Sequence, residues 1–342
     1  MKVSIIGATG YSGLELIRYL HAHPYAELVS VHSRTERKPI DEIHPYLQGL
    51  LSLPLEAIDH ERIMAISDVV FLALPSGFSK ELALPFIKND FPVIDLSGDF
   101  RLRERGAYEK WYHSDETHYP WIQKFDYGLS EFRTDSSKKF IANPGCYATA
   151  AELSFAPLLK EHQIILDSIV IDGKSGLSGA GKALAPTSHF VQANENMSVY
   201  KVNTHQHIPE IIQQFQQWTP KLKAIQFTTS LIPVTRGIFM TAYGKLKEKQ
   251  TTNQLLDCYQ TCYKNHPFIR IQKNNVFPTL KQVVGTNFCD IGLAVNEETD
   301  TVTIVTAIDN LGKGAAGQAI QNMNLLAGFP ETAGLLQLPI YP

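Results

Sequence analysis

About the first 145 residues alternate short apolar runs with segments of helical periodicity. Residues 2–6 form an apolar run that predicts a buried strand, and Leu14, Ile17 and Leu20 follow at the spacing of one helix face. Further apolar runs predict strands over 26–32, 69–74 and 91–96, with an amphipathic segment over 79–87. Strands that alternate with helices predict a parallel, doubly wound sheet, so we expect a Rossmann-type α/β domain here.

From residue 146 onward the pattern is different. A helix is predicted over Tyr147–His162, just beyond Cys146, and longer β-rich runs follow at 168–172, 225–232, 237–246 and 289–308. The polar residues 296–300 interrupt the last run and predict a hairpin turn between two alternating strands. Such hairpins favour an antiparallel sheet, and therefore an α+β second domain.

The C-terminal region predicts one more helix. Residues 313–326 have helical periodicity, and Gly328 and Pro330 end it. Because an isolated helix of this length is marginal in water, we expect it to pack on the first domain. The predicted organisation is a first domain of residues 1–145, completed by 313–342, and a second domain of residues 146–312.

Length and charge narrow the classes of function. The 342 residues exceed the size at which a single hydrophobic core usually stops growing, and an apolar content of 44% is ample for two domains. The 31 Lys and Arg against 34 Asp and Glu give a net charge of -3, so there is no broad basic field for nucleic acid. A small-molecule partner is the remaining expectation.

Several features predict a cytoplasmic, soluble protein. Four cysteines without paired spacing fit a reducing compartment. The apolar run at the N-terminus ends at Gly7, which is too early for a signal peptide. No apolar stretch approaches the roughly 20 residues that span a bilayer, so we expect no membrane partner.

A glycine-rich turn between the first strand and the first helix predicts a dinucleotide site. Gly7, Gly10 and Gly13 form G-x-x-G-x-x-G, and such glycines allow a tight turn, the approach of a pyrophosphate and close packing of helix on strand. The spacing alone is a weak signal, and a plain strand-turn-helix is the alternative.

The residues after the second predicted strand favour NADP over NAD. NAD-binding proteins place an acidic residue about 20 positions beyond the glycines, whereas this chain has Ser33 and Arg34 there. A hydroxyl and a guanidinium can bind a 2′-phosphate that a carboxylate would repel. The alternative is a solvated charged loop. Small residues in Leu74-Pro75-Ser76-Gly77 leave room for a nicotinamide ring against the backbone.

Cys146 is the candidate nucleophile because it stands at the start of a predicted helix. Backbone N–H groups and the positive helix end stabilise a thiolate there, and the same donors can receive an oxyanion. The alternative is a small buried hydrophobic residue, as most free cysteines are. Cys258, Cys262 and Cys289 fit that alternative, since no metal-ligand residues accompany them.

A nucleophilic cysteine needs a base, and His205 and His207 are the best candidates. A zinc site is the alternative for His-x-His, but no partner cysteine or HExxH arrangement accompanies it, and we expect no metal. The glycine-rich segment 174–182 is a candidate phosphate cradle. It lacks the Walker spacing, which argues against ATP.

Nine motifs together resemble the N-acetyl-γ-glutamyl-phosphate reductases, the arginine-biosynthesis branch of the semialdehyde dehydrogenases. The resemblance extends almost from end to end. The motifs are GATGYSG at 7–13, LPSG at 74–77, DLSGDFRL at 95–102, YGLSE at 127–131, NPGCYAT at 143–149, GKSGLSGAGK at 173–182, HQHIPEI at 205–211, PVTRGIFMT at 233–241 and DNLGKGAAGQAIQNMN at 309–324.

The resemblance implies roles for individual residues. Cys146 is expected to be the nucleophile, His207 the acid/base, and His205 a neighbour on the substrate side. The expected NADP contacts are Gly7, Thr9, Gly10, Tyr11, Ser12, Gly13, Ser33, Arg34, Leu74, Pro75, Ser76, Gly77, Ser178, Gly179 and Asn310. The expected substrate contacts are Ser97, Arg101, Asn143, His205 and Arg236. The chain differs from the common family pattern at Gln206, where Arg is usual, and at Ser230, where His is usual.

The implied fold is that of the glyceraldehyde-phosphate dehydrogenase group, with a catalytic domain whose sheet forms a homodimer or homotetramer interface. The implied reaction is NADPH-dependent reduction of an acyl phosphate to an aldehyde through a cysteine thioester. The N-acyl group stays open between acetyl and succinyl, and aspartyl and aminoadipyl phosphates are alternative substrates. A non-catalytic NADP sensor is the alternative of a different class, and it has no use for a cysteine paired with a histidine.

Overall fold

The computed structural model describes residues 1–133, 135 and 137–340. The chain divides into two compact units. The first contains residues 1–145 and 315–336, and the second contains residues 146–314 and 337–342. Each unit has its own seven-stranded sheet.

The first unit is built on a parallel sheet with the order β3-β2-β1-β4-β5-β7-β6. Its inner strands are continuous apolar runs because helices cover both faces of such a sheet. The predicted doubly wound sheet is confirmed. The strands are β1 (Lys2–Ile6), β2 (Glu27–His32), β3 (Leu55–Glu56), β4 (Val69–Leu72), β5 (Val93–Asp95), β6 (Asp126–Tyr127) and β7 (Phe140–Ala142).

Short helices connect these strands. They are α1 (Tyr11–His21), α2 (Ile40–Ile43), η1 (Pro45–Leu47), α3 (His60–Ile66), α4 (Ser79–Leu82), α5 (Leu84–Lys88), α6 (Ala107–Tyr112), α7 (Tyr119–Ile122) and η2 (Ser130–Phe132). The amphipathic segment predicted over 79–87 is two helices, because Pro85 lies in the first turn of α5 and has no N–H with which to continue α4. The C-terminal helix α12 (Gly317–Ala327) packs against α1 and β5 and so belongs to this unit.

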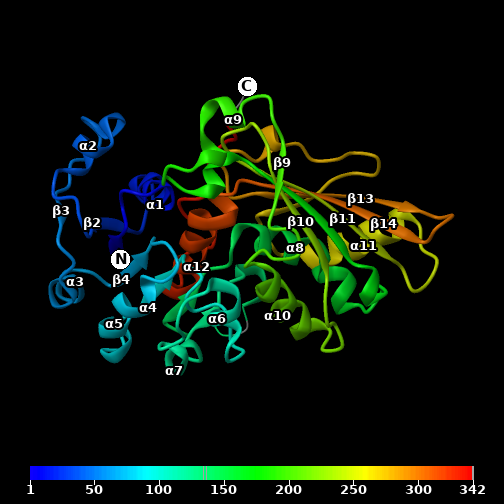
Figure 1. The fold of residues 1–342 in the computed structure, drawn as a ribbon, viewed down its shortest axis with the longest axis horizontal. Coiled ribbons are helices and arrows are strands. Elements are labelled where there is room, and N and C mark those ends of the chain that lie inside the picture. Colours follow the sequence, from blue (N-terminus) through cyan, green and yellow to red (C-terminus); the bar gives the residue numbers. More distant parts are fainter. Residues whose placement is uncertain (134, 136, 341–342) are drawn as a thin grey trace. The chain divides into compact units, whose positions relative to one another are not determined.

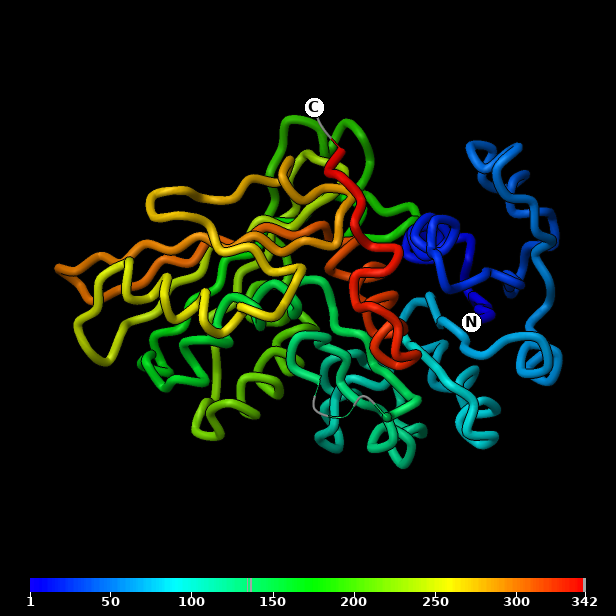
Figure 2. The backbone as a smooth tube through the Cα atoms, turned by 180° about the vertical axis from the view of Figure 1, so that it is seen from behind, coloured from blue at the N-terminus to red at the C-terminus, as the bar shows by residue number. Residues whose placement is uncertain are grey.

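The second unit has a mixed sheet with the order β12-β13-β14-β11-β8-β10-β9. The antiparallel sheet predicted from hairpins is wrong in part, since β8 pairs with β10, and β12 with β13, in parallel. The hairpin at 296–300 is present between β13 and β14, drawn in orange in Figure 2. The strands are β8 (Val170–Ser175), β9 (Ser198–Tyr200), β10 (Gln226–Leu231), β11 (Ile238–Lys245), β12 (Ile269–Ile271), β13 (Cys289–Asn296) and β14 (Thr301–Ile308).

The central helix of the second unit, α8 (Cys146–Lys160), lies against β11 and β14, with α10 (Ile208–Trp218) and α11 (Thr252–Tyr263) packed beside it (Figure 1). Pro157 stands inside α8 and cannot donate to the carbonyl of Leu153, four residues back. The Tyr263 hydroxyl donates to that carbonyl at 2.5 Å instead. α8 is therefore continuous across its proline, and α11 completes its hydrogen bonding.

The remaining elements of the second unit are short. They are η3 (Leu166–Ser168), η4 (Leu177–Ala180), η5 (Pro186–Ser188), α9 (Phe190–Ala193) and η6 (Leu280–Gln282). The π-helical turn η7 (Gly312–Ala316) begins in the second unit and ends in the first. The sequence predicts a C-terminal helix from residue 313, but the regular α-helix begins at Gly317 because η7 precedes it.

Candidate active site

The predicted site residues of the first unit follow the carboxyl ends of its parallel strands. Open α/β sheets bind ligands at this edge. β1 leads to the glycine turn at 7–13, β2 to Ser33 and Arg34, β4 to the turn at 74–77, β5 to the segment 97–101, and β7 to Asn143.

The three glycines of the predicted pyrophosphate turn have different surroundings. A Cβ atom on Gly7, where φ is +96°, would collide with the carbonyl oxygen of Ala73, and one on Gly13 would collide with the carbonyl oxygen of Gly7. These two glycines therefore allow close backbone packing. A Cβ on Gly10 would meet Gly7 O at 3.6 Å, so the space beside Gly10 is open. Thr9 lies within this turn, and Tyr11 and Ser12 begin α1, whose N-terminal amides favour an anion.

Ser33 and Arg34, the predicted contacts of a 2′-phosphate, form a turn held by internal hydrogen bonds. The Ser33 hydroxyl oxygen accepts from the backbone N–H of Glu36 at 3.2 Å, which leaves its proton to donate to a ligand. The Arg34 guanidinium lies 3.7 Å from the centre of the Phe78 ring, an aromatic contact that fixes its plane. Arg37 donates from Nη1 to the Ser33 carbonyl at 2.8 Å and so braces the turn.

The turn at 74–77 is locked to the following segment by a buried carboxylate. Asp99 accepts from the backbone N–H of Gly77 at 2.7 Å, from that of Lys80 at 2.9 Å and from the Tyr108 hydroxyl at 2.7 Å. The Gly98 N–H donates to Ser76 Oγ at 3.0 Å. Asp99 lies within the predicted substrate turn 97–101, but only Ser97 and Arg101 are predicted as contacts, and the bonds of Asp99 to residues up to 22 positions away are not expected from the sequence.

Ser97, Arg101 and Asn143 hold neighbouring strand ends together. The Ser97 hydroxyl donates to Asp95 Oδ2 at 2.7 Å, and burial, together with the Asp99 charge, raises the pKa of Asp95. Arg101 Nε donates to the Asn143 carbonyl at 2.8 Å, and Asn143 Nδ2 donates to the Ala315 carbonyl at 3.0 Å. All three predicted substrate residues are buried, and their roles toward a substrate stay predictions.

In the second unit, Cys146 is the first residue of α8 rather than the residue before it. The N–H groups of the first turn have no carbonyl partners within the helix, so the thiol stands at the positive end of a buried helix. Its neighbour Tyr147 points into the unit and donates from its hydroxyl to the Ser230 carbonyl at 3.2 Å. Tyr200 donates to the Tyr147 hydroxyl oxygen at 3.3 Å.

The two histidines gather around Tyr147. The rings of His205 and His207 lie 4.6 Å apart, and both contact the Tyr147 ring edge-on, at 5.3 and 6.2 Å. Burial raises the pKa of Tyr200 to about 12, and the nearby charge of Cys146 adds to this effect. Cys146, Tyr147, Tyr200, His205 and His207 are called the Tyr147 cluster below.

Burial and a backbone contact set the protonation of His205 in the Tyr147 cluster. The His207 backbone N–H donates to His205 Nδ1 at 3.1 Å, so that nitrogen is an acceptor. Burial, followed by the charges of His207 and Lys201, lowers the pKa of His205 to about 2. His205 is therefore neutral across the physiological range. His207 directly precedes α10 and is also buried.

The remaining predicted residues of the second unit form a hydrogen-bonded loop assembly. Asn310 Nδ2 donates to Ser178 Oγ at 2.9 Å, and its Oδ1 accepts from the backbone N–H of Gly237 at 2.7 Å. Gly179 follows Ser178 in η4. Arg236 forms two hydrogen bonds with Asp309, at 3.0 and 3.1 Å. Asp309 is fully buried and is not among the residues predicted from the sequence.

The two departures from the family pattern occupy different places. Gln206 accepts from Lys201 Nζ at 2.8 Å at the surface. The Phe227 ring packs on Tyr147 at 5.8 Å, and side chains alternate along β10, so Ser230 lies on the opposite face of that strand.

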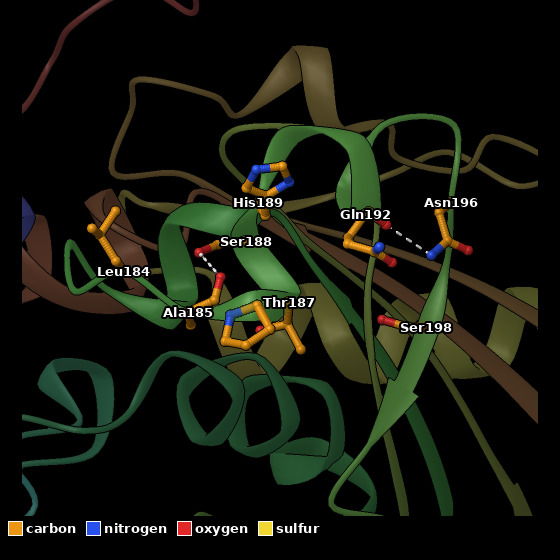
Figure 3. Close-up of a pocket in the computed structure, with 9 residues that line it drawn as sticks. Leu184, Ala185, Thr187, Ser188, His189, Gln192, Asn196 and Ser198 are labelled. Carbon is orange, nitrogen blue, oxygen red and sulfur yellow. Dashed lines mark hydrogen bonds between the residues drawn. The ribbon is translucent and has the colours of Figure 1, made fainter.

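A pocket of about 700 Å³ lies elsewhere in the second unit (Figure 3). Its walls come from η5, α9 and the start of β9, and include Thr187, His189 and Ser198. Internal hydrogen bonds, such as that from Asn196 Nδ2 to the Gln192 carbonyl at 2.9 Å, shape it. None of the predicted site residues lines this pocket, so we assign it no part of the predicted chemistry.

Two kinds of feature are absent from the described part of the chain. Residues 1–133, 135 and 137–340 contain no group of three or more His, Cys, Asp or Glu side chains placed to hold a metal ion. In the same ranges no helix has the length and apolar character needed to cross a membrane.

Two family models cover most of the chain. The model of the semialdehyde dehydrogenase NAD-binding domain matches residues 2–140, and that of the semialdehyde dehydrogenase dimerisation domain matches residues 146–310. The chain is 53% identical to the N-acetyl-gamma-glutamyl-phosphate reductase of Listeria monocytogenes serotype 4b (strain CLIP80459), with 100% of both chains covered. It is also 53% identical to the reductase of the same name from Streptococcus gordonii, again over 100% of both.

Solved structures share the fold at low identity. Aspartate semialdehyde dehydrogenase II from Vibrio cholerae superposes with a TM-score of 0.71 and 16% identity, covering 96% of this chain and 98% of the other. Aspartate semialdehyde dehydrogenase with NADP from Candida albicans has a TM-score of 0.65 and 14% identity, covering 95% and 98%.

Proposed function

Because the chain belongs to the semialdehyde dehydrogenase family, in the branch of the N-acetyl-γ-glutamyl-phosphate reductases, we propose that it reduces N-acetyl-γ-glutamyl phosphate to N-acetyl-glutamate 5-semialdehyde and phosphate, with NADPH as hydride donor. This is a step of arginine biosynthesis. The observation that carries the proposal is Cys146 as the first residue of the buried helix α8, directly before Tyr147, whose ring contacts both His205 and His207.

The Tyr147 cluster supplies the groups that the chemistry requires. The Cys146 thiolate adds to the acyl carbonyl carbon, the carbon–oxygen bond to phosphate breaks, and phosphate leaves with the electron pair. The N-terminal amides of α8 stabilise the oxyanion of the tetrahedral intermediate. The product of this half-reaction is a thioester on Cys146.

NADPH, when bound, supplies the hydride that converts the thioester to a hemithioacetal. His207 then gives a proton to the developing oxyanion and takes it back as the carbon–sulfur bond breaks, which releases the aldehyde and the thiolate. His205 is neutral and offers hydrogen bonds to the substrate instead of a titrating proton.

The cofactor and the compartment are parts of the same proposal. The open side of Gly10 would receive the pyrophosphate, and Ser33 with Arg34 would bind the 2′-phosphate. The protein would associate with itself through the second unit, as a homodimer or homotetramer. It would act in the cytoplasm, where the Cys146 thiol stays reduced.

An assay in the reverse direction tests the substrate. The protein is mixed with NADP, phosphate and a semialdehyde, and NADPH formation is followed with N-acetyl-glutamate, N-succinyl-glutamate, aspartate and aminoadipate semialdehydes. The proposal requires N-acetyl-glutamate semialdehyde to have the highest kcat/KM. A higher kcat/KM with one of the other three semialdehydes would identify that compound as the substrate instead. Absence of turnover with all four would indicate a non-catalytic NADP-binding protein.

Arg34→Ala tests the cofactor assignment. A hydrogen bond to a charged group contributes about 1.5–3 kcal/mol, so the KM for NADPH should rise about 10- to 100-fold. The KM for NADH should change little, because NADH lacks the 2′-phosphate. Steady-state kinetics with both cofactors measure this difference.

Arg37→Ala is the matched control for Arg34→Ala. Its guanidinium bonds to the Ser33 and Glu36 carbonyls and braces the same turn, so its loss should affect both cofactors alike. An equal rise in KM for NADPH and NADH in Arg34→Ala would mean that Arg34 does not bind the 2′-phosphate.

A further inference from the structure

The π-helical turn η7 contacts the nucleophile directly. A Cβ atom placed on Gly314 would stand 2.8 Å from Cys146 Cβ and 3.2 Å from Cys146 Cα. Carbon atoms in ordinary contact are about 3.5–4.0 Å apart, so any side chain at Gly314 would displace one of the two segments. The absence of a side chain at Gly314 therefore makes room for Cys146.

Asp309 holds this turn from within. The Gly314 N–H donates at 2.9 Å to the Asp309 carbonyl, five residues back, which is the hydrogen bond of a π turn. Asp309 Oδ1 accepts from the backbone N–H of Leu311 at 2.8 Å and from that of Gly312 at 3.0 Å. The turn is thus tied to one fully buried carboxylate.

The same carboxylate orients Arg236. Asp309 accepts from Arg236 Nε and Nη2, and its Oδ2 also accepts from the Gly285 N–H at 2.5 Å. A bidentate pair fixes the plane of a guanidinium as well as its position. Asp309 therefore connects a candidate substrate arginine to the turn that contacts Cys146.

We propose that Asp309 and Gly314 are positioning residues, and that the turn between them sets the spacing of the Cys146 thiol and the Arg236 guanidinium. The inference rests on the proposed function for its meaning in catalysis. Two interactions carry it: the contact between Gly314 and Cys146, and the two hydrogen bonds by which Asp309 orients Arg236. α8 is buried along almost its whole length and cannot shift as a body, so a change at Gly314 acts on Cys146 or on the turn.

Gly314→Ala tests the contact with the nucleophile. A displacement of about 1 Å at a reacting atom can cost about 10²-fold, so kcat should fall by about that factor with KM values little changed. Alkylation of Cys146 by iodoacetamide should also shift to higher pH, because the displaced thiolate loses its position at the helix end. Initial rates and mass spectrometry across pH measure both effects.

Gly244→Ala is the matched control in the same unit. Its new methyl group would press on Ile164 and reach Phe155 of α8. This variant should unfold at a lower temperature while keeping kcat and the alkylation profile of the wild-type protein. A Gly314→Ala protein that behaves in the same way would overturn the positioning role.

A double-mutant cycle separates the contact from the reaction. Cys146→Gly removes the atom that the new methyl group would meet at 2.8 Å and leaves only the contacts at 3.2 Å with Cys146 Cα and Asp309 O. Gly314→Ala should therefore lower the melting temperature less in that background than in the wild type. An undiminished loss, or failure of the double variant to fold, would mean that η7 itself requires the glycine and would refute the contact. This cycle needs no substrate, so it gives its answer even if the acyl-phosphate assay fails.

Asp309→Asn tests the other end of the turn. An amide nitrogen cannot accept from Arg236, so the guanidinium loses half of its orienting pair and the KM for the acyl phosphate should rise about tenfold. The KM for NADPH should stay unchanged. Asp290→Asn breaks the Arg270–Asp290 bidentate pair of the same unit and serves as the control for lost stability. Equal KM values in the two variants would refute the role of Asp309.

Discussion

Serine in place of Cys146 is expected to keep NADPH binding and to lose turnover by several orders of magnitude. The nucleophile of this chemistry is an anion, and a hydroxyl at the helix end does not ionise where a thiol does. Kinetics with the acyl phosphate and a binding titration with NADPH measure the two properties separately. Mass spectrometry of the wild-type protein mixed with acyl phosphate alone should find one acyl adduct, on Cys146.

Cys258→Ser is the matched control. Burial, with a smaller effect of Glu161, raises the pKa of Cys258 to about 11, so this residue stays a thiol and takes no part in the reaction. Its serine variant should retain the wild-type rate. Turnover that survives in Cys146→Ser, or an acyl adduct on Cys258, would remove Cys146 from the mechanism.

Asparagine in place of His207 is expected to lower kcat by about 10² to 10⁴-fold, the range for losing a general acid/base, with a modest change in KM. His205→Asn should act mainly on KM for the acyl phosphate. The pKa of His205 is about 2, so this group stays neutral as the pH is varied around neutrality and cannot produce an ionisation limb there. The pH dependence of kcat in both variants measures the difference.

Two outcomes would contradict this assignment. If His205→Asn removes the limb near neutral pH and His207→Asn keeps it, the roles are exchanged. If His207→Asn lowers the melting temperature and leaves the pH–rate profile unchanged, His207 packs against the start of α10 and does not transfer protons.

The sequence predicts those parts of the fold and site that depend on residues close together in the chain. The parallel sheet of the first unit follows from apolar runs that alternate with helices. The close packing at Gly13 and the place of Cys146 at a helix start depend on neighbours within about seven residues, which a motif contains, whereas the packing of Gly7 against Ala73 is not local. The parallel pairing of β8 with β10 depends on a connection of fifty residues, and the hairpin pattern contains no sign of it.

Site residues that act through distant partners could not be predicted. Asp99 contacts the candidate site through its bonds to Gly77 and Lys80, and Asp309 through its bond to Arg236, 73 residues away. The contact of Arg34 with the Phe78 ring could not be predicted either, because the two residues are far apart in the chain. An extended segment would make the two histidines point apart. His207 instead has helical dihedral angles, because α10 begins at the next residue, and the two rings face one cluster.

The proline inside α8 has a consequence for the order in which the protein is made. The carbonyl of Leu153 accepts from the hydroxyl of Tyr263, a residue that is synthesised 110 positions later. The Gly314 backbone that packs on Cys146 is synthesised later still. Because domains fold as units once their parts are present, α8 lacks both of these contacts while the chain emerges. The first helix of the second unit to be made is thus completed by two of its last segments, so a chain truncated before residue 263 should lack both contacts.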